Sequence, residues 1–333
     1  MRLFFDSRQL AHAPVQELHN GAFVPSAEHQ GRVKSVLAAI GATEPVYDHG
    51  EGPLRAVHSE DYLAFLWSAY QDWKSEGRPG DAGGYVWPVV GRRPLKLDRI
   101  DARLGLYSFD ASSPIAAGTW EGAYWSAQTA LTALGAIADG EHHAFAFSRP
   151  PGHHCGRDYL GGYCYLNNAA IAAEAACAAG KRVAILDIDY HHGNGTQDIF
   201  YDRGEVLFVS IHADPVRDYP FFWGHADETG EAEGEGANLN LPLSRGSDMA
   251  AYRPALDEAL ERIAGFGADL LVCSYGADTF GGDPISHFRL ETADYPVVAR
   301  QISSLDLPTL IVMEGGYAVD ALGTNVAAFL SGF

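Results

Sequence analysis

The sequence has little of what would indicate a disulfide-stabilised or membrane-bound protein. Its 333 residues include four cysteines (Cys155, Cys164, Cys177 and Cys273) and no Cys-x-x-Cys pair, which fits a reduced, cytoplasmic protein better than a disulfide framework. No apolar run approaches the roughly 18 residues that a membrane span needs. The short apolar run at the start of the chain ends in a charge at Asp6 and lacks a cleavage site, unlike a signal peptide. We therefore expect a cytoplasmic protein with no membrane partner.

Positive charge is also scarce. Lysine and arginine number 23 against 43 aspartates and glutamates, so the formal net charge is −20. This balance argues against nucleic acid and anionic membrane surfaces as partners, and it would favour cationic ligands near the surface. Taken alone, however, the charge is explained better by solubility or a salty habitat.

Short apolar runs alternate with longer amphipathic ones along most of the chain. We expect strands at residues 1–6, 144–148, 206–212, 270–274 and 309–313, and in the run that begins at residue 183. We expect helices at residues 28–40, 58–70, 119–137, 167–179, 196–201, 248–264 and 292–303, and after the last strand. Strands alternating with helices predict a single α/β domain over residues 1–333, with a central, mostly parallel sheet flanked by helices on both faces. The active site should lie at the carboxyl ends of the strands.

Residues 74–113 interrupt this alternation. Glycine, proline, arginine and aromatic residues mix there without periodicity. A structureless stretch of this length in a compact domain usually has a function or forms an interface.

The run beginning at residue 183 is the most informative part of the chain. Its first half is apolar and β-branched, which predicts a buried parallel strand that continues into a loop. Side chains two apart on a strand share a face, so Asp187, Asp189 and His191 should point the same way. Two carboxylates and an imidazole at the end of a buried strand need a counter-charge, and a divalent metal ion is the simplest one. The alternative is a polar strand end satisfied by hydrogen bonds.

A catalytic zinc site typically has three protein ligands and an open position for water. Asp189 and His191 supply two ligands, and Asp278 is the best candidate for the third because Gly276 and residues 281–282 permit a tight turn near the metal. A turn or helix-capping aspartate is an equally good interpretation of Asp278. Asp187 should lie behind the ligands. Two carboxylates and one imidazole would also accept iron(II) or cobalt.

Two further features predict hydrolytic chemistry. His153 and His154 follow a rigid Pro-Pro-Gly segment, and such a pair can take a proton from water and supply one to a leaving amine, each ring oriented by an Asp or Asn. Tyr317, after the last strand, could donate to a developing oxyanion. Together with the metal ligands these groups predict metal-assisted hydrolysis of a carbonyl compound, the metal lowering the pKa of water from about 15.7 toward 7.

The ordered motifs resemble those of the histone deacetylase superfamily, which has the arginase/deacetylase fold. They are Arg149-Pro-Pro-Gly-His-His154, Gly161-Gly-Tyr-Cys-Tyr-Leu-Asn-Asn168, Asp187-Ile-Asp-Tyr-His-His-Gly-Asn-Gly-Thr196, Val209-Ser-Ile-His212, Asp278 and Glu314-Gly-Gly-Tyr317. Within the superfamily the chain looks most like the bacterial acetylpolyamine amidohydrolases, on the strength of residues 16–25, 74–113 and 118–121.

This resemblance implies a role for each motif residue. The implied zinc ligands are Asp189, His191 and Asp278. The implied catalytic groups are His154 as general base and acid with Asn194 behind it, His153 oriented by Asp187, and Tyr317 polarising the scissile carbonyl. A potassium or sodium ion is implied at Asp187, the Ser210 hydroxyl and the backbones of Asp189, His191 and Ile211, and a second one at backbone carbonyls near Phe200, Arg203 and Val206.

The resemblance also implies the substrate, a small cationic acetylated polyamine such as acetylputrescine, acetylcadaverine or possibly acetylspermidine. Tyr163 and Tyr219 would flank a narrow tunnel suited to a polymethylene chain. Gly162 and His19 would also contact the substrate. Glu17 and Asp101 would meet the distal ammonium as selectivity elements, since an exposed ion pair contributes only about 0–1 kcal/mol. Residues 74–113 match an insertion that forms a homodimer interface and narrows the channel mouth.

The chain departs from its presumed relatives at a few positions. Tyr219 stands where close relatives often have phenylalanine, and His19 where a tyrosine is common. Residues 281–282 replace bulkier polar ones, and Cys155 replaces a small alanine. These departures leave the chemistry intact and the preferred chain length open.

Three other functions compete. The same zinc chemistry could deacetylate acetyl-lysine in peptides or proteins, although that substrate needs an open rim. A phosphatase that uses a DxD strand end would need further lysine and acidic groups and leaves the histidine pair unexplained. A non-catalytic polyamine sensor would not need the complete set of catalytic groups.

Overall fold

The computed structural model describes residues 1–89 and 96–333. Positions 90–95, which belong to the expected insertion at residues 74–113, lie outside the described residues.

The centre of the structure is a seven-stranded sheet in the order β1-β4-β9-β8-β5-β6-β7, in which every neighbouring pair is parallel. The strands are β1 (Arg2–Phe4), β4 (His143–Ala146), β5 (Val183–Asp187), β6 (Val206–Ala213), β7 (Asn238–Leu243), β8 (Leu270–Tyr275) and β9 (Thr309–Met313). Four of the five inner strands, β5, β6, β8 and β9, are buried along their whole length. This explains their continuous apolar sequences, because both faces of the sheet are covered.

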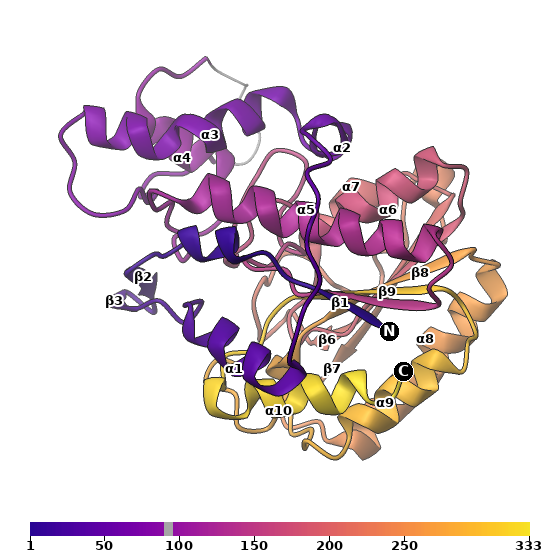
Figure 1. Cartoon of the computed structure of the whole chain (residues 1–333). Helices are drawn as coiled ribbons and strands as arrows, with labels where there is room; N and C mark the ends of the chain where they lie inside the picture. Colours follow the sequence, from indigo (N-terminus) through magenta and orange to yellow (C-terminus); the bar gives the residue numbers. More distant parts are fainter. Residues whose placement is uncertain (90–95) are drawn as a thin grey trace.

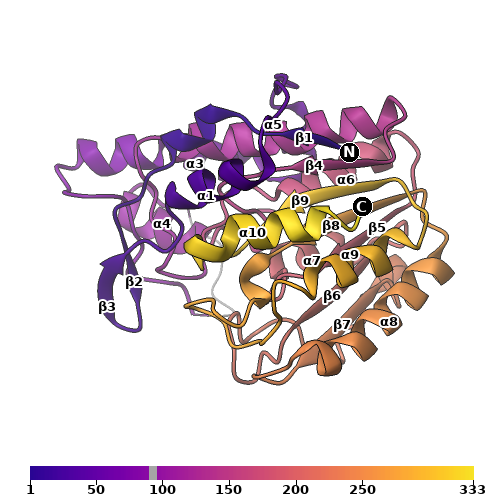
Figure 2. The same cartoon turned by 60° about the horizontal axis from the view of Figure 1, so that its bottom comes forward.

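Helices cover both faces of this sheet (Figure 1). One face carries α2 (Gly52–Val57), α3 (Glu60–Ser75), α5 (Thr119–Ala138) and α6 (Asn168–Ala178), and the other carries α1 (Gly31–Ile40), α8 (Met249–Phe266), α9 (Tyr295–Ser303) and α10 (Val319–Leu330). Figure 2 shows α8, α9 and α10 together on one side, with α3 and α5 on the other. The predicted α/β fold class is therefore confirmed.

Each inner strand contributes to two separate cores. Along β5, Val183 and Ile185 pack with the α5–α6 face, whereas Ala184 and Leu186 pack with the α8–α10 face. This is the two-residue alternation of a strand. It holds the strand ends rigidly between two layers, so the loops that follow them start from fixed positions.

Several elements differ from the sequence-based expectation. The strand at residue 183 ends at Asp187, so residues 188–193 form a loop and do not extend the strand. The segment 74–113 is not wholly structureless, since it contains α4 (Ile100–Tyr107). Three elements were not expected from the sequence: the hairpin β2–β3 (Gln16–His19 and Ala22–Pro25), helix α2 and the edge strand β7. Helix α7 (Asn194–Phe200) was expected, but it begins two residues earlier than predicted.

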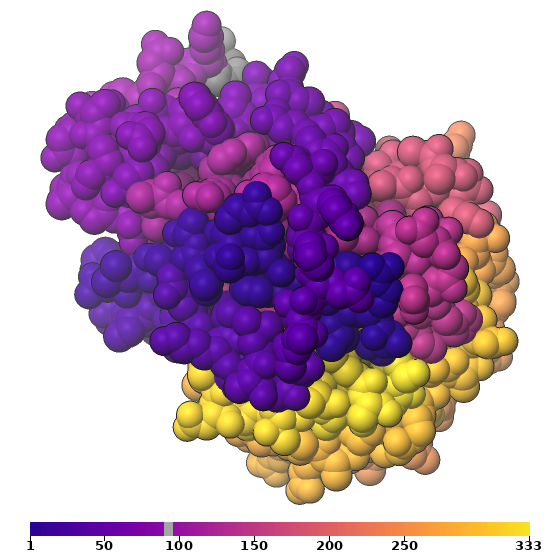
Figure 3. Space-filling view, viewed as in Figure 1, coloured from indigo at the N-terminus to yellow at the C-terminus, as the bar shows by residue number. Residues whose placement is uncertain are grey.

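The N-terminal residues connect the helices on one face of the sheet with the helices on the other face. Figure 3 shows the indigo N-terminal part lying on the surface between the purple and magenta helices and the yellow C-terminal helix. Beneath it, the buried Glu28 accepts hydrogen bonds from Arg149 (2.8 Å) and Arg32 (2.9 Å). Among the helices of residues 1–89 and 96–333, none combines the length and apolarity that a membrane crossing requires.

Candidate active site

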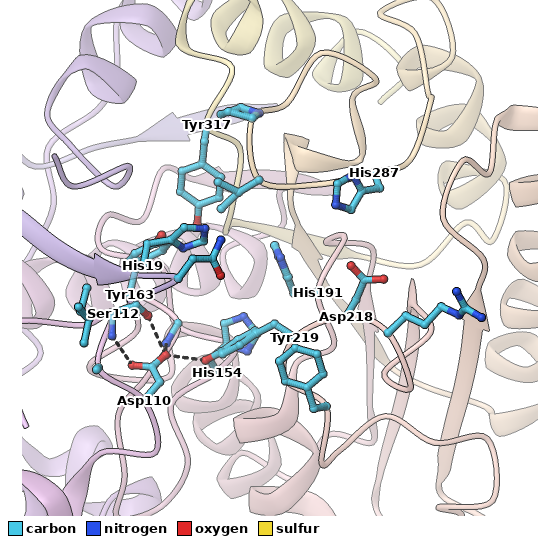
Figure 4. A pocket seen from close by; sticks show the side chains of 18 of the residues that line it. His19, Asp110, Ser112, His154, Tyr163, His191, Asp218, Tyr219, His287 and Tyr317 are labelled. Carbon is cyan, nitrogen blue, oxygen red and sulfur yellow. Dashed lines mark hydrogen bonds between the residues drawn. The ribbon is translucent and has the colours of Figure 1, made fainter. Parts of the chain in front are cut away.

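A pocket of about 490 Å³ opens at the carboxyl ends of the strands (Figure 4). Seven of the residues singled out from the sequence line it, namely His19, His154, Gly162, Tyr163, His191, Tyr219 and Tyr317. They come from the β2–β3 hairpin and from the loops that follow β4, β5, β6 and β9. The sheet topology therefore brings together residues that are almost 300 positions apart in the sequence.

The three predicted metal ligands form one cluster. The ligand atoms of Asp189, His191 and Asp278 all lie within 4.8 Å of one another. The two carboxylates are fully buried, and the His191 side chain is 12% exposed. Gly276 makes this approach possible, because a Cβ there would lie 2.0 Å from Asp189 Oδ2.

The electrostatics of this cluster fit a bound cation. His191 Nδ1 lies 3.3 Å from Asp189 Oδ1 and 3.1 Å from Asp278 Oδ2. Burial and the neighbouring Asp189 charge raise the pKa of Asp278 to about 7, against the effect of His191. Two buried carboxylates this close repel each other unless a positive charge lies between them. Asp278 accepts a hydrogen bond from the Tyr190 N–H (3.0 Å) and does not cap its own turn, which argues against the interpretation of it as a turn aspartate.

The two adjacent histidines have different partners. His153 Nδ1 lies 3.0 Å from Asp187 Oδ2, and His154 Nδ1 lies 2.7 Å from Asn194 Oδ1. Although burial alone would lower it, the charges of Asp187 and Asp189 raise the pKa of His153 to about 10. Burial and the adjacent His153 lower the pKa of His154 well below its usual value. His154 is therefore the neutral member of the pair, able to accept a proton.

Tyr317 is placed by a tightly bonded loop. It is 8% exposed, and its ring faces Tyr163 with the centroids 5.5 Å apart. Burial raises the pKa of its hydroxyl well above 10, so the hydroxyl keeps its proton and can donate. Figure 4 shows the hydroxyl directed into the pocket.

The residues assigned to monovalent cations lie behind the metal cluster. Asp187 and Ser210 are direct neighbours across β5 and β6, and Ile211 is buried beside them. Asp187 Oδ1 accepts from the Asp189 N–H (3.1 Å), and the Ser210 hydroxyl lies 2.9 Å from His212 Nδ1. At the second assigned site the carbonyl of Phe200 accepts from the Arg203 N–H (3.0 Å), next to the start of β6 at Val206. Both cation sites remain predictions.

Aromatic side chains and a glycine form the walls of the pocket. The ring of Tyr219 stands nearly perpendicular to His154, with the centroids 5.1 Å apart. Gly162 has φ +54°, and a Cβ there would lie 2.1 Å from His154 Cδ2. Only glycine therefore fits at this position beside His154.

The two carboxylates expected at a substrate ammonium do not line this pocket in the described chain. Glu17 is buried and accepts hydrogen bonds from the Tyr163 hydroxyl (2.8 Å) and the Ala27 N–H (3.0 Å). Asp101 is buried under Arg78 and Arg99. Each carboxylate already has partners within its own chain, so their contact with substrate stays a prediction.

Two other aspartates do line the pocket, and sequence analysis missed them. Asp110 Oδ2 accepts from the Gly162 N–H, the Ser112 hydroxyl and the Tyr219 hydroxyl, each at 2.8 Å. Asp218 accepts from the Tyr190 hydroxyl (2.9 Å) and pairs with Arg245. Neither follows a buried strand directly, which is the signal that identified Asp189 and Asp278.

Comparison with known proteins adds independent findings. Residues 26–333 match the family model described as the histone deacetylase domain. The chain is 48% identical to acetylpolyamine amidohydrolase 2 of Pseudomonas aeruginosa, over all of this chain and 98% of that protein. It is 43% identical to the acetylpolyamine amidohydrolase of Mycoplana ramosa, over all of this chain and 99% of that protein. The crystal structure of an acetylpolyamine aminohydrolase from Burkholderia pseudomallei superposes with a TM-score of 0.96 at 40% identity, covering 100% of this chain and 98% of the other.

Proposed function

The chain belongs to the histone deacetylase family, and from that premise we propose that it is a zinc-dependent hydrolase of small N-acetylated polyamines, with acetylputrescine and acetylcadaverine as first candidates. One observation carries the proposal. His154, Tyr317 and His191 line one pocket, and His191 belongs to the cluster with Asp189 and Asp278 that lies at its base; the pKa of His154 is lowered and that of Tyr317 is raised, which favours a neutral imidazole and a protonated hydroxyl. The 48% identity to an acetylpolyamine amidohydrolase over the full chain supports the same substrate class.

Asp189, His191 and Asp278 would hold the metal ion. A donor set of two carboxylates and one imidazole suits zinc and also accepts iron(II) or cobalt. Such an ion, when bound, lowers the pKa of a water molecule and polarises a carbonyl group.

The other residues of the pocket handle protons and charge. The Nδ1–H of His154 points to Asn194, which leaves Nε2 free to accept the proton of the attacking water. The same nitrogen returns that proton to the amine when the C–N bond breaks, and acetate and the free amine result. Tyr317 donates a hydrogen bond from its hydroxyl to the carbonyl oxygen as negative charge develops there. His153 keeps its proton beside Asp187 and so maintains positive charge next to the reacting centre.

The aromatic walls of the pocket would suit a thin substrate, and Asp110 would attract its positive charge. Tyr163 and Tyr219 offer apolar faces to a polymethylene chain, and Asp110 supplies a carboxylate among the lining residues. The apolar segment that includes Tyr85, Val86 and Val89 is exposed to 61%, 56% and 68%. We propose that it forms the homodimer interface and narrows the channel, which would exclude folded proteins that carry acetyl-lysine.

Two variants test the assignment of the catalytic groups. His154→Ala and Tyr317→Phe should each lower kcat for acetylputrescine by about 10²-fold or more, because each removes a group needed only as the reaction proceeds. Both should retain one equivalent of zinc by elemental analysis, since neither residue belongs to the ligand cluster. Unchanged turnover in either variant would refute the mechanism, whereas loss of zinc would mean that the residue supports the metal site instead.

A further inference from the structure

A buried aspartate outside the predicted active-site set holds the backbone of Tyr317. Asp283 Oδ2 accepts hydrogen bonds from two consecutive backbone amides, the Tyr317 N–H at 2.6 Å and the Ala318 N–H at 3.1 Å. Its other oxygen, Oδ1, accepts from the Ile285 N–H at 3.1 Å. Asp283 is 8% exposed, so these bonds are shielded from water. A buried, ionised carboxylate makes short and strong bonds to amides.

Asp283 connects two walls of the pocket. Pro284 and Ile285 belong to one lining segment, and Tyr317 belongs to another. The side chain of Asp283 joins these two segments through its three hydrogen bonds. The position of the Tyr317 backbone in the pocket therefore depends in part on this carboxylate.

The loop that carries Tyr317 is held by three charged groups. The Gly315 N–H donates to Asp189 Oδ2 (2.9 Å), and Arg32 Nε donates to the Gly316 carbonyl (2.8 Å). Asp283 accepts from the Tyr317 and Ala318 amides. Gly316 precedes them with φ +125°, a conformation that L side chains rarely adopt. Ser35 donates to the Val319 carbonyl further along (2.6 Å), so Asp283 is the group that binds the Tyr317 amide itself.

We propose that Asp283 is a positioning residue for the reaction: it fixes the backbone of Tyr317 so that the hydroxyl faces the scissile carbonyl. This inference rests on the proposed function, in which Tyr317 donates to the developing oxyanion. Asp283 acts through Tyr317 and does not touch the substrate. Its effect should therefore appear in kcat and should disappear when the Tyr317 hydroxyl is absent.

A double-mutant cycle tests the inference. Asp283→Asn keeps one acceptor oxygen and turns an NH₂ group toward the amides on its other side, so it cannot join the Tyr317 and Ala318 amides to the Ile285 amide, and the Tyr317 loop should lose its fixed position. A misplacement of about 1 Å can cost about 10²-fold in rate, and we expect kcat to fall about 10-fold to 100-fold with KM changed less than about threefold. In the Tyr317→Phe background the same substitution should change the residual kcat by less than about twofold. An equal loss in both backgrounds, or no loss in either, would overturn the inference.

Asp248 provides a matched control. Its Oδ1 also accepts from two consecutive amides, the Ala250 and Ala251 N–H groups at the exposed start of α8, each at 3.1 Å. Asp248→Asn should leave kcat unchanged. If Asp248→Asn lowers kcat as much as Asp283→Asn does, the effect is general destabilisation and the inference fails.

A spectroscopic measurement separates this inference from the proposed substrate. In zinc-loaded protein labelled with 3-fluorotyrosine, the ¹⁹F signal of Tyr317 is identified by its absence from Tyr317→Phe. Asp283→Asn should broaden or split that signal, and an unaltered signal would overturn the inference whatever the substrate. A wild-type protein that releases no acetate from acetylated diamines would refute the proposed function and leave this measurement valid. If Asp283→Asn does not fold, Asp283→Glu retains an acceptor and should shift the same signal.

Discussion

At the scale of single residues, the two adjacent histidines of the pocket differ in protonation because a different side chain lies behind each ring. His153 faces the carboxylate of Asp187, and His154 faces the amide of Asn194. A carboxylate favours the charged ring, whereas a neutral amide orients the ring without adding negative charge. The difference places the neutral, proton-accepting nitrogen on His154.

Asn194→Asp tests this division of tasks. A carboxylate 2.7 Å from Nδ1 would favour the protonated ring and raise the pKa of His154, by about 1–3 units for a nearby opposite charge. Because the base must be neutral to act, the acid limb of kcat/KM against pH should move to higher pH by a similar amount. The measurement is a pH–rate profile with saturating zinc. An acid limb that stays in place or moves to lower pH would contradict the assignment of His154 as the base.

The sequence identified the residues that directly follow buried strands. Asp189 and Asp278 could be predicted because their strands, β5 and β8, are continuous apolar runs that end in a loop with glycine. Asp110 and Asp283 could not be predicted in this way. Asp110 depends on contacts with Gly162 and Tyr219, and Asp283 on contacts with Tyr317, and only the folded chain brings those partners together.

At the scale of helices, strands and loops, the buried strands and the edge strand β1 were predictable, whereas the edge strand β7 was not. Strands β5, β6, β8 and β9 are covered on both faces, so their sequences are continuously apolar. Strand β7 lies at the sheet edge, is only partly buried and contains Pro242, so it lacks that signal. Helix α4 has eight residues and no side-chain cap at Arg99, which left it hidden in an irregular segment.

The loop that carries the histidine pair is held by a buried ionic network. Glu28 accepts from Arg149, the first residue of the Arg-Pro-Pro-Gly-His-His motif, and from Arg32, which also bonds the loop of Tyr317. All three side chains are fully buried. One carboxylate thus links two loops of the pocket to the N-terminal part of the chain.

Glu28→Gln should be strongly destabilising. It leaves two guanidinium groups buried without a counter-charge, and breaking a buried ion pair in this way costs about 3–5 kcal/mol. Denaturant unfolding monitored by tryptophan fluorescence measures the loss. The matched control is Glu44→Gln, which breaks a partly exposed pair with Arg2 and should cost no more than about 1 kcal/mol. Equal losses in the two variants would refute the structural role of Glu28.

At the scale of the whole molecule, the net charge and the exposed apolar surface determine which molecules the protein attracts or binds. The net charge of −20 raises the local concentration of cations around the protein, which suits a polyamine substrate. The exposed residues Tyr85, Val86 and Val89 form an apolar segment of the kind that usually marks an interface.

Charged substitutions in this segment test the proposed dimer. Val86→Asp combined with Val89→Asp should convert the dimer to a monomer in sedimentation velocity. The new carboxylates of the two copies would repel each other, and burying them without a partner would cost free energy. If the segment also narrows the channel, the monomer should gain activity on an acetyl-lysine peptide. Tyr47→Asp is the control, since Tyr47 is 66% exposed, its backbone N–H bonds Thr132 of α5, and its substitution should leave the assembly unchanged. An unchanged sedimentation coefficient in the double variant would place the interface elsewhere.

The central claim is that this pocket deacetylates small polyamines. The direct measurement is acetate release by the zinc-loaded protein from acetylputrescine, acetylcadaverine, acetylspermidine and an acetyl-lysine peptide, compared as kcat/KM. We predict that the acetylated diamines exceed the peptide by at least about tenfold, because the aromatic lining residues Tyr163 and Tyr219 and the carboxylate of Asp110 would suit a thin cationic chain. A peptide hydrolysed as well as the diamines, or better, would contradict the account of the substrate and leave the metal-assisted chemistry in place.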